Sequence, residues 1–184
     1  TSLSDAKAAF DRFQSDVGTM QDLRLAKELY LPHAKQGGPS VQLALANVYI
    51  HIALNAQGTL TPAANYRDAV KCFQKAVQLY LPDAKQGDPS VQVALAKAYR
   101  QIAKYVDNPD IASESYREAI KWIRKGVDQG YSKAYSDMAY AYSNGLGVPE
   151  DHVESVRWLK GALMLGDGNA ALTLSGFYAI GRGV

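Results

Sequence analysis

The sequence predicts an all-α fold of about four stacked helix pairs, because two kinds of internal repetition occur at periods typical of helical repeat arrays. At an offset of 50, residues 29–37 recur as 79–87 with one exchange, and residues 66–71 recur as 116–121 with two. At an offset of 36, three residue types recur together: Trp122 and Trp158, Gly130 and Gly166, Tyr142 and Tyr178. One helix pair cannot bury its apolar face alone, so stacked neighbours are expected to complete the core.

The spacing of apolar residues and turn residues gives the order of the elements. Residues 1–14 predict a short N-terminal helix, and residues 55–62 predict the longest loop. Four helix pairs are expected, each with a first and a second helix. The first helices are expected at 17–36, 63–86, 111–129 and 151–165, and the second helices at 39–55, 89–105, 132–143 and 168–179.

Residues that favour helix ends stand at these boundaries. Pro39 and Pro89 suit a first helical position, where the missing N–H has no intrahelical partner. Asp110 and Asp151 are expected to cap the helices that follow them. The glycines of the 36-residue repeat are expected to end first helices, because glycine adopts the left-handed conformation at little cost.

The two periods differ because the first two repeats are longer. Cys72 lies 15 residues before its helix-ending glycine, whereas the equivalent Trp122 lies 8 residues before Gly130. The first two repeats therefore carry seven extra residues. Pro32 and Pro82 lie in these insertions and are expected to kink or restart their helices.

Each helix pair needs small residues where backbones approach and large apolar residues in the seams. The expected large residues are Phe73, Trp122 and Trp158 on first helices and Leu95, Met138 and Leu174 on second helices. Four tyrosines, which stand twelve residues after a helix-ending glycine, are also expected in the core: Tyr49, Tyr99, Tyr142 and Tyr178. Their hydroxyls would reach solvent or a carbonyl.

Residues 119–151 read A-x-x-W-x-x-K-G-x-x-x-G, followed by a second helix that ends Y-x-x-G-x-G-V-x-x-D. This pattern resembles the Sel1-like repeat, a relative of the tetratricopeptide repeat, closely over 111–184 and more loosely over the remainder. The resemblance implies one right-handed superhelical solenoid domain over 1–184 with about four repeats. The expected segments are an N-terminal helix at 1–16 and repeats at 17–60, 61–110, 111–147 and 148–184, the last ending a truncated array.

The resemblance implies a non-catalytic scaffold for protein–protein interaction, which binds a protein or peptide on a curved surface. It also implies a role in bacterial signalling or envelope assembly, and it favours a periplasmic or secreted location over a cytoplasmic one. Two alternatives stay open, namely an envelope protein that binds glycan or peptidoglycan, and a hydrolase.

Composition narrows the classes of partner. The 20 Lys and Arg residues nearly balance 18 Asp and Glu residues, which argues against a nucleic-acid-binding protein. The most apolar stretch, residues 43–56, is interrupted by polar residues and is too short to span a membrane. A single cysteine, Cys72, excludes an internal disulfide.

The candidate catalytic and ligand-binding residues favour structural roles. The G-x-G turns at 145–147 and 181–183 lack the strand and third glycine of a dinucleotide site. Cys72 takes a tryptophan position and is expected to be a small buried residue. Three histidines lie in different repeats, without metal-ligand spacing: His33, His51 and His152. We therefore expect no catalytic residue, no metal and no cofactor.

Basic residues of the first helices are candidates for partner binding, because the resemblance implies that first helices line the concave face. Tyrosines without an expected core position, on first and second helices, are the other candidates. An acidic partner could meet the basic residues, and exposed tyrosines are common at interfaces. The candidates are Lys71, Lys75, Lys121, Arg124 and Lys125, together with Tyr116, Tyr135 and Tyr140. A solvated helix face is the simpler explanation of the charges, because exposed charges are common.

The chain stops directly after the turn at 181–183, with no following helix to cover the last pair. Terminal repeats normally need a polar cap. We therefore expect that the natural protein continues, or that this end packs on another molecule, including a second copy of the chain.

Overall fold

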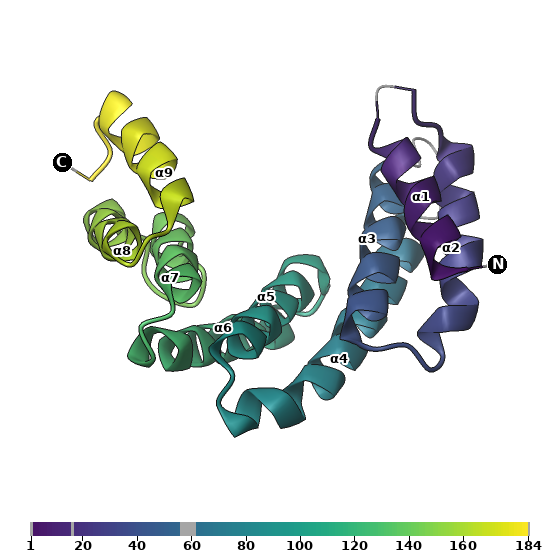
Figure 1. Ribbon diagram of the computed structural model, residues 1–184, viewed down its shortest axis with the longest axis horizontal. Coiled ribbons are helices and arrows are strands. Elements are labelled where there is room, and N and C mark those ends of the chain that lie inside the picture. The colour runs from purple at the N-terminus through teal and green to yellow at the C-terminus, as the bar shows by residue number, and fades with distance from the viewer. Residues whose placement is uncertain (1, 16, 56–61, 184) are drawn as a thin grey trace. The chain divides into compact units, whose positions relative to one another are not determined.

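The computed structural model describes residues 2–15, 17–55 and 62–183, and these form nine α-helices and no strand (Figure 1). The predicted all-α fold is confirmed for these ranges, while most of the predicted loop at 55–62 lies outside them. In chain order the helices are α1 (Leu3–Phe13), α2 (Met20–Ala34), α3 (Pro39–Asn55), α4 (Pro62–Gln86), α5 (Pro89–Tyr105), α6 (Pro109–Asp128), α7 (Ser132–Asn144), α8 (His152–Met164) and α9 (Gly168–Ala179).

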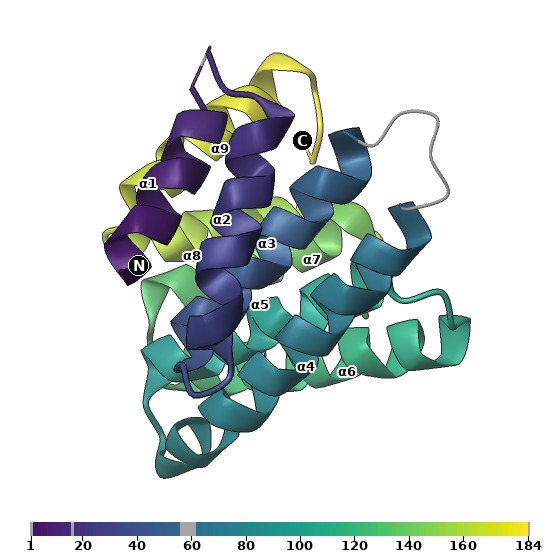
Figure 2. The ribbon, with the colours of Figure 1, turned by 90° about the vertical axis from the view of Figure 1, so that its right-hand side faces the viewer.

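The chain folds as two compact units, to which α4 and α5 both contribute. Unit 1 comprises residues 1–79 and 104–107, and unit 2 comprises residues 80–103 and 108–184. Within unit 1, α1 packs on α2 and α2 packs on α3, as both views show (Figures 1 and 2). Within unit 2, α7 packs between α6 and α8, and α8 packs on α9.

Every predicted helix is present, and its ends agree with the prediction within three residues. Pro39 and Pro89 begin α3 and α5 as expected. Asp151 caps α8, because its carboxylate accepts a hydrogen bond from the Glu154 amide at 2.9 Å. Local propensity and tertiary packing therefore agree at most helix ends.

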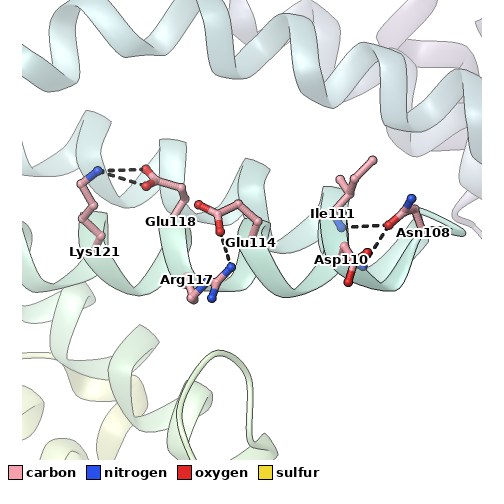
Figure 3. Close-up of polar contacts among 7 residues, drawn as sticks. All are labelled: Asn108, Asp110, Ile111, Glu114, Arg117, Glu118 and Lys121. Atoms are coloured by element: carbon pink, nitrogen blue, oxygen red, sulfur yellow. Dashed lines mark hydrogen bonds and ion pairs between the residues drawn. The ribbon is translucent and has the colours of Figure 1, made fainter.

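The N-cap of α6 is Asn108, so the predicted cap at Asp110 is wrong. The Asn108 Oδ1 atom accepts hydrogen bonds from the amides of Asp110 at 2.9 Å and Ile111 at 3.1 Å (Figure 3). Pro109 takes the first helical position, which suits its fixed φ, so the helix starts earlier than expected. Asp110 then lies in the first turn, where a negative charge stabilises the helix dipole.

The predicted restart at Pro82 is also wrong, because α4 runs without interruption through this residue to Gln86. Pro82 lies near the end of the helix, where its missing N–H removes one backbone hydrogen bond and the following amides keep theirs. Pro32 similarly lies within α2, two residues before the helix ends.

The large residues predicted for the seams are buried, except for Trp158, which is half-buried. One side chain on each second helix is nearly inaccessible, namely Leu45, Leu95, Met138 and Leu174. In unit 2, Trp158 packs against a cluster that α7, α8 and α9 share, and this cluster includes Val156, Leu159 and Leu174. Full burial of each large side chain contributes about 1.5–3 kcal/mol to stability.

The four equivalent tyrosines differ in burial. Tyr49 is buried, and Tyr99 and Tyr142 are half-buried. Burial raises the pKa of both Tyr49 and Tyr99. Tyr178 is 45% exposed, so its predicted core position is wrong. α9 packs on α8 through Ala170 and Leu174, and among the helices described for unit 2 it packs extensively on α8 alone. The expected self-association through this end stays a prediction.

The turn after α7 needs glycine for two reasons. Gly147 has a φ of +76°, a conformation that side chains disfavour. A Cβ atom at this position would also lie 2.7 Å from the Tyr116 carbonyl oxygen. This close approach joins the turn to α6.

We predict that Gly147→Ala lowers the free energy of unfolding by about 2 kcal/mol or more, through the disfavoured φ and the backbone clash. Urea denaturation followed by circular dichroism measures the change. The control is Gly168→Ala, where an added Cβ meets no atom within 4 Å and φ is not positive. Equal losses in the two variants would contradict this account.

Candidate functional site

A groove of about 360 Å³ lies in unit 2, and α5, α7, α8 and α9 contribute to its walls. Its polar lining includes Lys97, Lys133, Ser136, Asp137, Asn169 and Thr173. Its apolar lining includes Leu159, Ala170 and Phe177. A pre-formed concave site with an apolar floor and a few polar groups is the usual form of a binding site.

The groove lining includes the buried carboxylate of Asp137 on α7. Its Oδ1 atom lies 3.4 Å from Nη1 of Arg100, and its Oδ2 atom lies 3.5 Å from Nζ of Lys97. Both cations come from α5. The carboxylate therefore holds two positive charges at one wall, and each ion pair is stronger than it would be in bulk water.

Tyr140 lies one turn further along α7 and is 50% exposed. The Arg100 guanidinium lies 4.7 Å from the centroid of its ring, which is a favourable cation–π distance. Arg100 therefore links the buried Asp137 to an exposed aromatic ring. This linkage restricts the ring before any partner arrives.

The start of α9 forms another part of the lining. Asp167 caps this helix by accepting a hydrogen bond from the Asn169 amide at 3.1 Å. The same carboxylate accepts a hydrogen bond from the Ser136 hydroxyl of α7 at 2.6 Å. Because both parts of the lining are held by internal hydrogen bonds, the groove needs no ligand to define its shape.

The arrangement suits binding better than catalysis. Three cations in or beside the groove, Lys97, Lys133 and Arg100, face two carboxylates, so it has a small positive excess. Its buried serine, Ser155, donates its hydroxyl to the Ala139 carbonyl at 2.8 Å and is therefore already engaged. Covalent catalysis needs a nucleophile bonded to a base that a third group orients.

The tyrosines predicted for partner binding have different surroundings. Tyr140 lies in the groove, as described above. Tyr135 is half-buried and packs edge-on against Trp158, with ring centroids 5.6 Å apart. Tyr116 is half-buried beside the Gly147 turn.

The basic residues predicted on α6 are exposed. Lys121 forms an ion pair with Glu118 at 3.0 Å (Figure 3). The Lys125 ammonium lies 4.2 Å from the Trp122 ring centroid. Arg124 is exposed. These residues do not line the groove of unit 2.

Lys71 and Lys75 lie on the α4 segment of unit 1. Lys71 is exposed and forms an ion pair with Asp68 at 3.1 Å. Lys75 is half-buried, and its ammonium donates to the Ala34 carbonyl at 2.6 Å. Lysine at such a position satisfies the carbonyls that α2 leaves unpaired at its end.

Sequence reasoning missed the charged residues of the groove, because on the helix at 132–143 it considered only the tyrosines for partner binding. Lys133, Asp137 and Tyr140 are spaced i, i+4 and i+7 on α7, so they share one face. A polar and aromatic stripe at this spacing on a second helix was the available signal. The link to Arg100 on α5 needed the folded structure.

The three histidines show no metal centre. His51 packs against the rings of Phe10 and Phe13, with centroids 5.5 Å and 5.4 Å away. Within the described ranges, no cluster of three or more His, Cys, Asp or Glu side chains is placed to hold a metal ion.

Among the helices of the described ranges, none combines the length and apolar character that crossing a bilayer requires.

The comparisons with known proteins identify the repeat. The family model of the Sel1 repeat matches residues 8–38, 40–80, 96–131 and 132–167, which together exceed half of the chain. These segments begin at other points of the helix pair than the expected boundaries, which stay a prediction. No curated protein matches the chain.

Two solved structures are similar to the chain to different extents. A Sel1 repeat protein from Oxalobacter formigenes is 23% identical with a TM-score of 0.50, and the match covers 100% of this chain and 66% of that one. This chain therefore spans just under two thirds of that relative. A protective antigen of uropathogenic Escherichia coli with an SLR fold is 19% identical with a TM-score of 0.36, and the match covers 100% and 50%.

We predict that Asp137→Ala lowers the free energy of unfolding by about 1–2 kcal/mol, because Lys97 and Arg100 lose their shared counter-charge. The matched control is Glu114→Ala, which removes the exposed ion pair with Arg117 on α6. This control should change stability by no more than about 0.5 kcal/mol. Urea denaturation measures both, and similar losses would contradict the central role of Asp137.

Cys72 should react slowly with alkylating reagents. Burial raises the pKa of its thiol from 9.0 to about 11. At pH 8 the thiolate fraction, and with it the rate of reaction with iodoacetamide, should be about a hundredfold lower than for an exposed cysteine. The rate should rise until the pH passes about 11. Mass spectrometry of timed samples measures this, and a rate that levels off near pH 9 would contradict the account.

Proposed function

Because the chain belongs to the Sel1 repeat family, whose members are generally protein-interaction scaffolds, we propose that it binds a segment of a partner protein in the groove of unit 2. The observation that carries this proposal is the chain of contacts from buried Asp137 through Arg100 to the exposed ring of Tyr140. Tyrosine and arginine are the residue types that dominate binding energy at protein interfaces.

A pre-ordered groove supports binding in a second way. Association costs free energy for every side chain that must be immobilised, at about 0.5–1.5 kcal/mol each. Arg100 and Asp137 are already held in the free protein. The partner therefore meets a wall that needs little further ordering.

The basic surface of α6 is a second proposed contact region, formed by Lys121, Arg124 and Lys125 with Tyr116 at its edge. Lys71, Lys75 and Tyr135 complete the proposed binding residues. The support for α6 is the exposure of its charges, which would attract an acidic partner mainly by accelerating association. The proposed setting in bacterial signalling or envelope assembly, and the periplasmic or secreted location, rest on family resemblance.

The hydrolase alternative has little support from motifs. The spacing S-x-x-K occurs at Ser4 and Lys7, but the S-D-N and K-T-G motifs that accompany it in serine β-lactamases are absent from the sequence. The glycan alternative is favoured only by the aromatic residues Tyr140 and Phe177 in the groove.

A peptide selection tests the proposed function. The full chain would be immobilised and panned with a random peptide library displayed on phage, and the selected peptides measured by calorimetry. We expect Tyr140→Ala to weaken their binding about tenfold or more, because it removes an exposed aromatic anchor. Arg157→Ala, at an exposed residue of α8 that does not line the groove, should leave the affinity within about twofold.

The possible results distinguish peptide binding in the groove from peptide binding at α6 and from glycan binding. Peptides that lose affinity with Arg124→Ala and keep it with Tyr140→Ala would move the site to α6. A library that yields no specific peptide, together with a glycan array that yields a ligand sensitive to Tyr140→Ala, would contradict protein binding in favour of glycan binding.

A further inference from the structure

A second groove, of about 650 Å³, lies in unit 1 between α2, α3 and α4. Twelve residues line it, and all but three are identical to the residue 50 positions later in the chain. Two of the three exchanges preserve size approximately, namely Glu28 for Gln78 and Asp68 for Glu118. The third is Cys72, which stands where unit 2 has Trp122.

The two sites also share their contacts. In unit 1, the Gln42 amide donates to the Ala34 carbonyl at 2.6 Å, and Lys71 pairs with Asp68 at 3.1 Å. The corresponding contacts of unit 2 are Gln92 to Ala84 at 3.1 Å and Lys121 to Glu118 at 3.0 Å. Because these contacts recur between equivalent residues, the exchange of Cys72 for tryptophan is the main difference between the two sets of residues.

In unit 2 this position is filled by a large aromatic ring. Trp122 is 4% exposed, and the Lys125 ammonium covers its ring at 4.2 Å from the centroid. Its indole Nε1 atom is buried and has no hydrogen-bond partner among the described residues. The ring is therefore held by apolar contact and by a cation, without a directional hydrogen bond.

In unit 1 the cysteine is too small to fill the equivalent space. The lysine that corresponds to Lys125 is Lys75, and its ammonium bonds to the carbonyls of Ala34 at 2.6 Å and Lys35 at 3.4 Å. Tyr49 and Leu45 belong to the apolar lining of the groove. The groove thus has the walls and the cation of a tryptophan site but lacks the tryptophan.

We propose that the groove of unit 1 receives a tryptophan side chain from a partner polypeptide, in the place that Trp122 occupies in unit 2. A buried tryptophan contributes a large apolar area, and a lysine above its ring adds a cation–π attraction. Lys75 is placed to supply this cation by turning from the end of α2. This site is separate from the groove of unit 2, and the proposal does not depend on partner binding there.

The test uses an acetylated and amidated pentapeptide with a central tryptophan flanked by alanines, titrated into the full chain. We expect a Kd of about 0.1–5 mM, as suits a single anchoring side chain. Amide signals of Tyr49, Cys72 and Lys75 should shift in NMR spectra, and saturating peptide should slow the alkylation of Cys72 at least threefold. The same peptide with a central leucine should bind at least fivefold more weakly.

Two variants of Cys72 sharpen the test. Cys72→Trp supplies the missing ring from the chain itself, so it should keep the helical circular dichroism spectrum and weaken peptide binding at least tenfold. Cys72→Ala leaves the groove open and should bind within twofold of the wild type. Equal affinity of all three proteins would overturn the proposal, as would signal shifts confined to other parts of the chain.

A Lys75 variant and a titration with free tryptophan test the proposal if Cys72→Trp does not fold. Lys75→Met keeps the apolar stem and removes the charge, and it should weaken binding of the tryptophan peptide about threefold. An unchanged affinity in this variant, together with no protection of Cys72, would overturn the proposal. Free L-tryptophan that binds as tightly as the peptide would assign the groove to a small molecule and exclude a polypeptide occupant.

Discussion

The structure depends on the burial of one large apolar side chain on each second helix. Leu45, Leu95, Met138 and Leu174 take this position in successive helix pairs, and each is almost inaccessible to solvent. A single pair of helices leaves such a side chain partly open, so each pair needs its neighbours. The helix-end signals set where each helix begins, but this repeated burial sets which face turns inward.

Repetition of the same packing position frees the other positions to vary. At one lining position of α4 and α6, Cys72 and Trp122 stand among largely identical residues, and only the tryptophan is a large side chain. On the second helices, Asp137 stands where α5 has Ala94, and this exchange places a buried carboxylate beside α5. Both candidate sites therefore arise from side-chain exchanges on a common frame, as is usual when function is added to a fold.

Sequence reasoning recovered the helices because their signals are local. Proline at helix starts, glycine at positive φ and regular apolar spacing each act within a few residues. Sequence reasoning failed where contacts between helices determine the exposure or the role of a side chain. The exposure of Tyr178 depends on what packs against α9, and the role of Asp137 depends on two cations from another helix. It also placed the partner-binding residues mainly on first helices, whereas the groove of unit 2 is formed largely by second helices.

Unfolding free energies of matched leucine variants test the repeated packing position most directly. Leu45 is 2% exposed and Leu54 is 59% exposed on α3, while Leu174 is 6% and Leu172 is 76% exposed on α9. The account predicts that Leu45→Ala and Leu174→Ala each cost about 2–5 kcal/mol, whereas Leu54→Ala and Leu172→Ala cost less than about 1 kcal/mol. Equal costs within either pair would contradict the claim that these equivalent positions hold the helix pairs together.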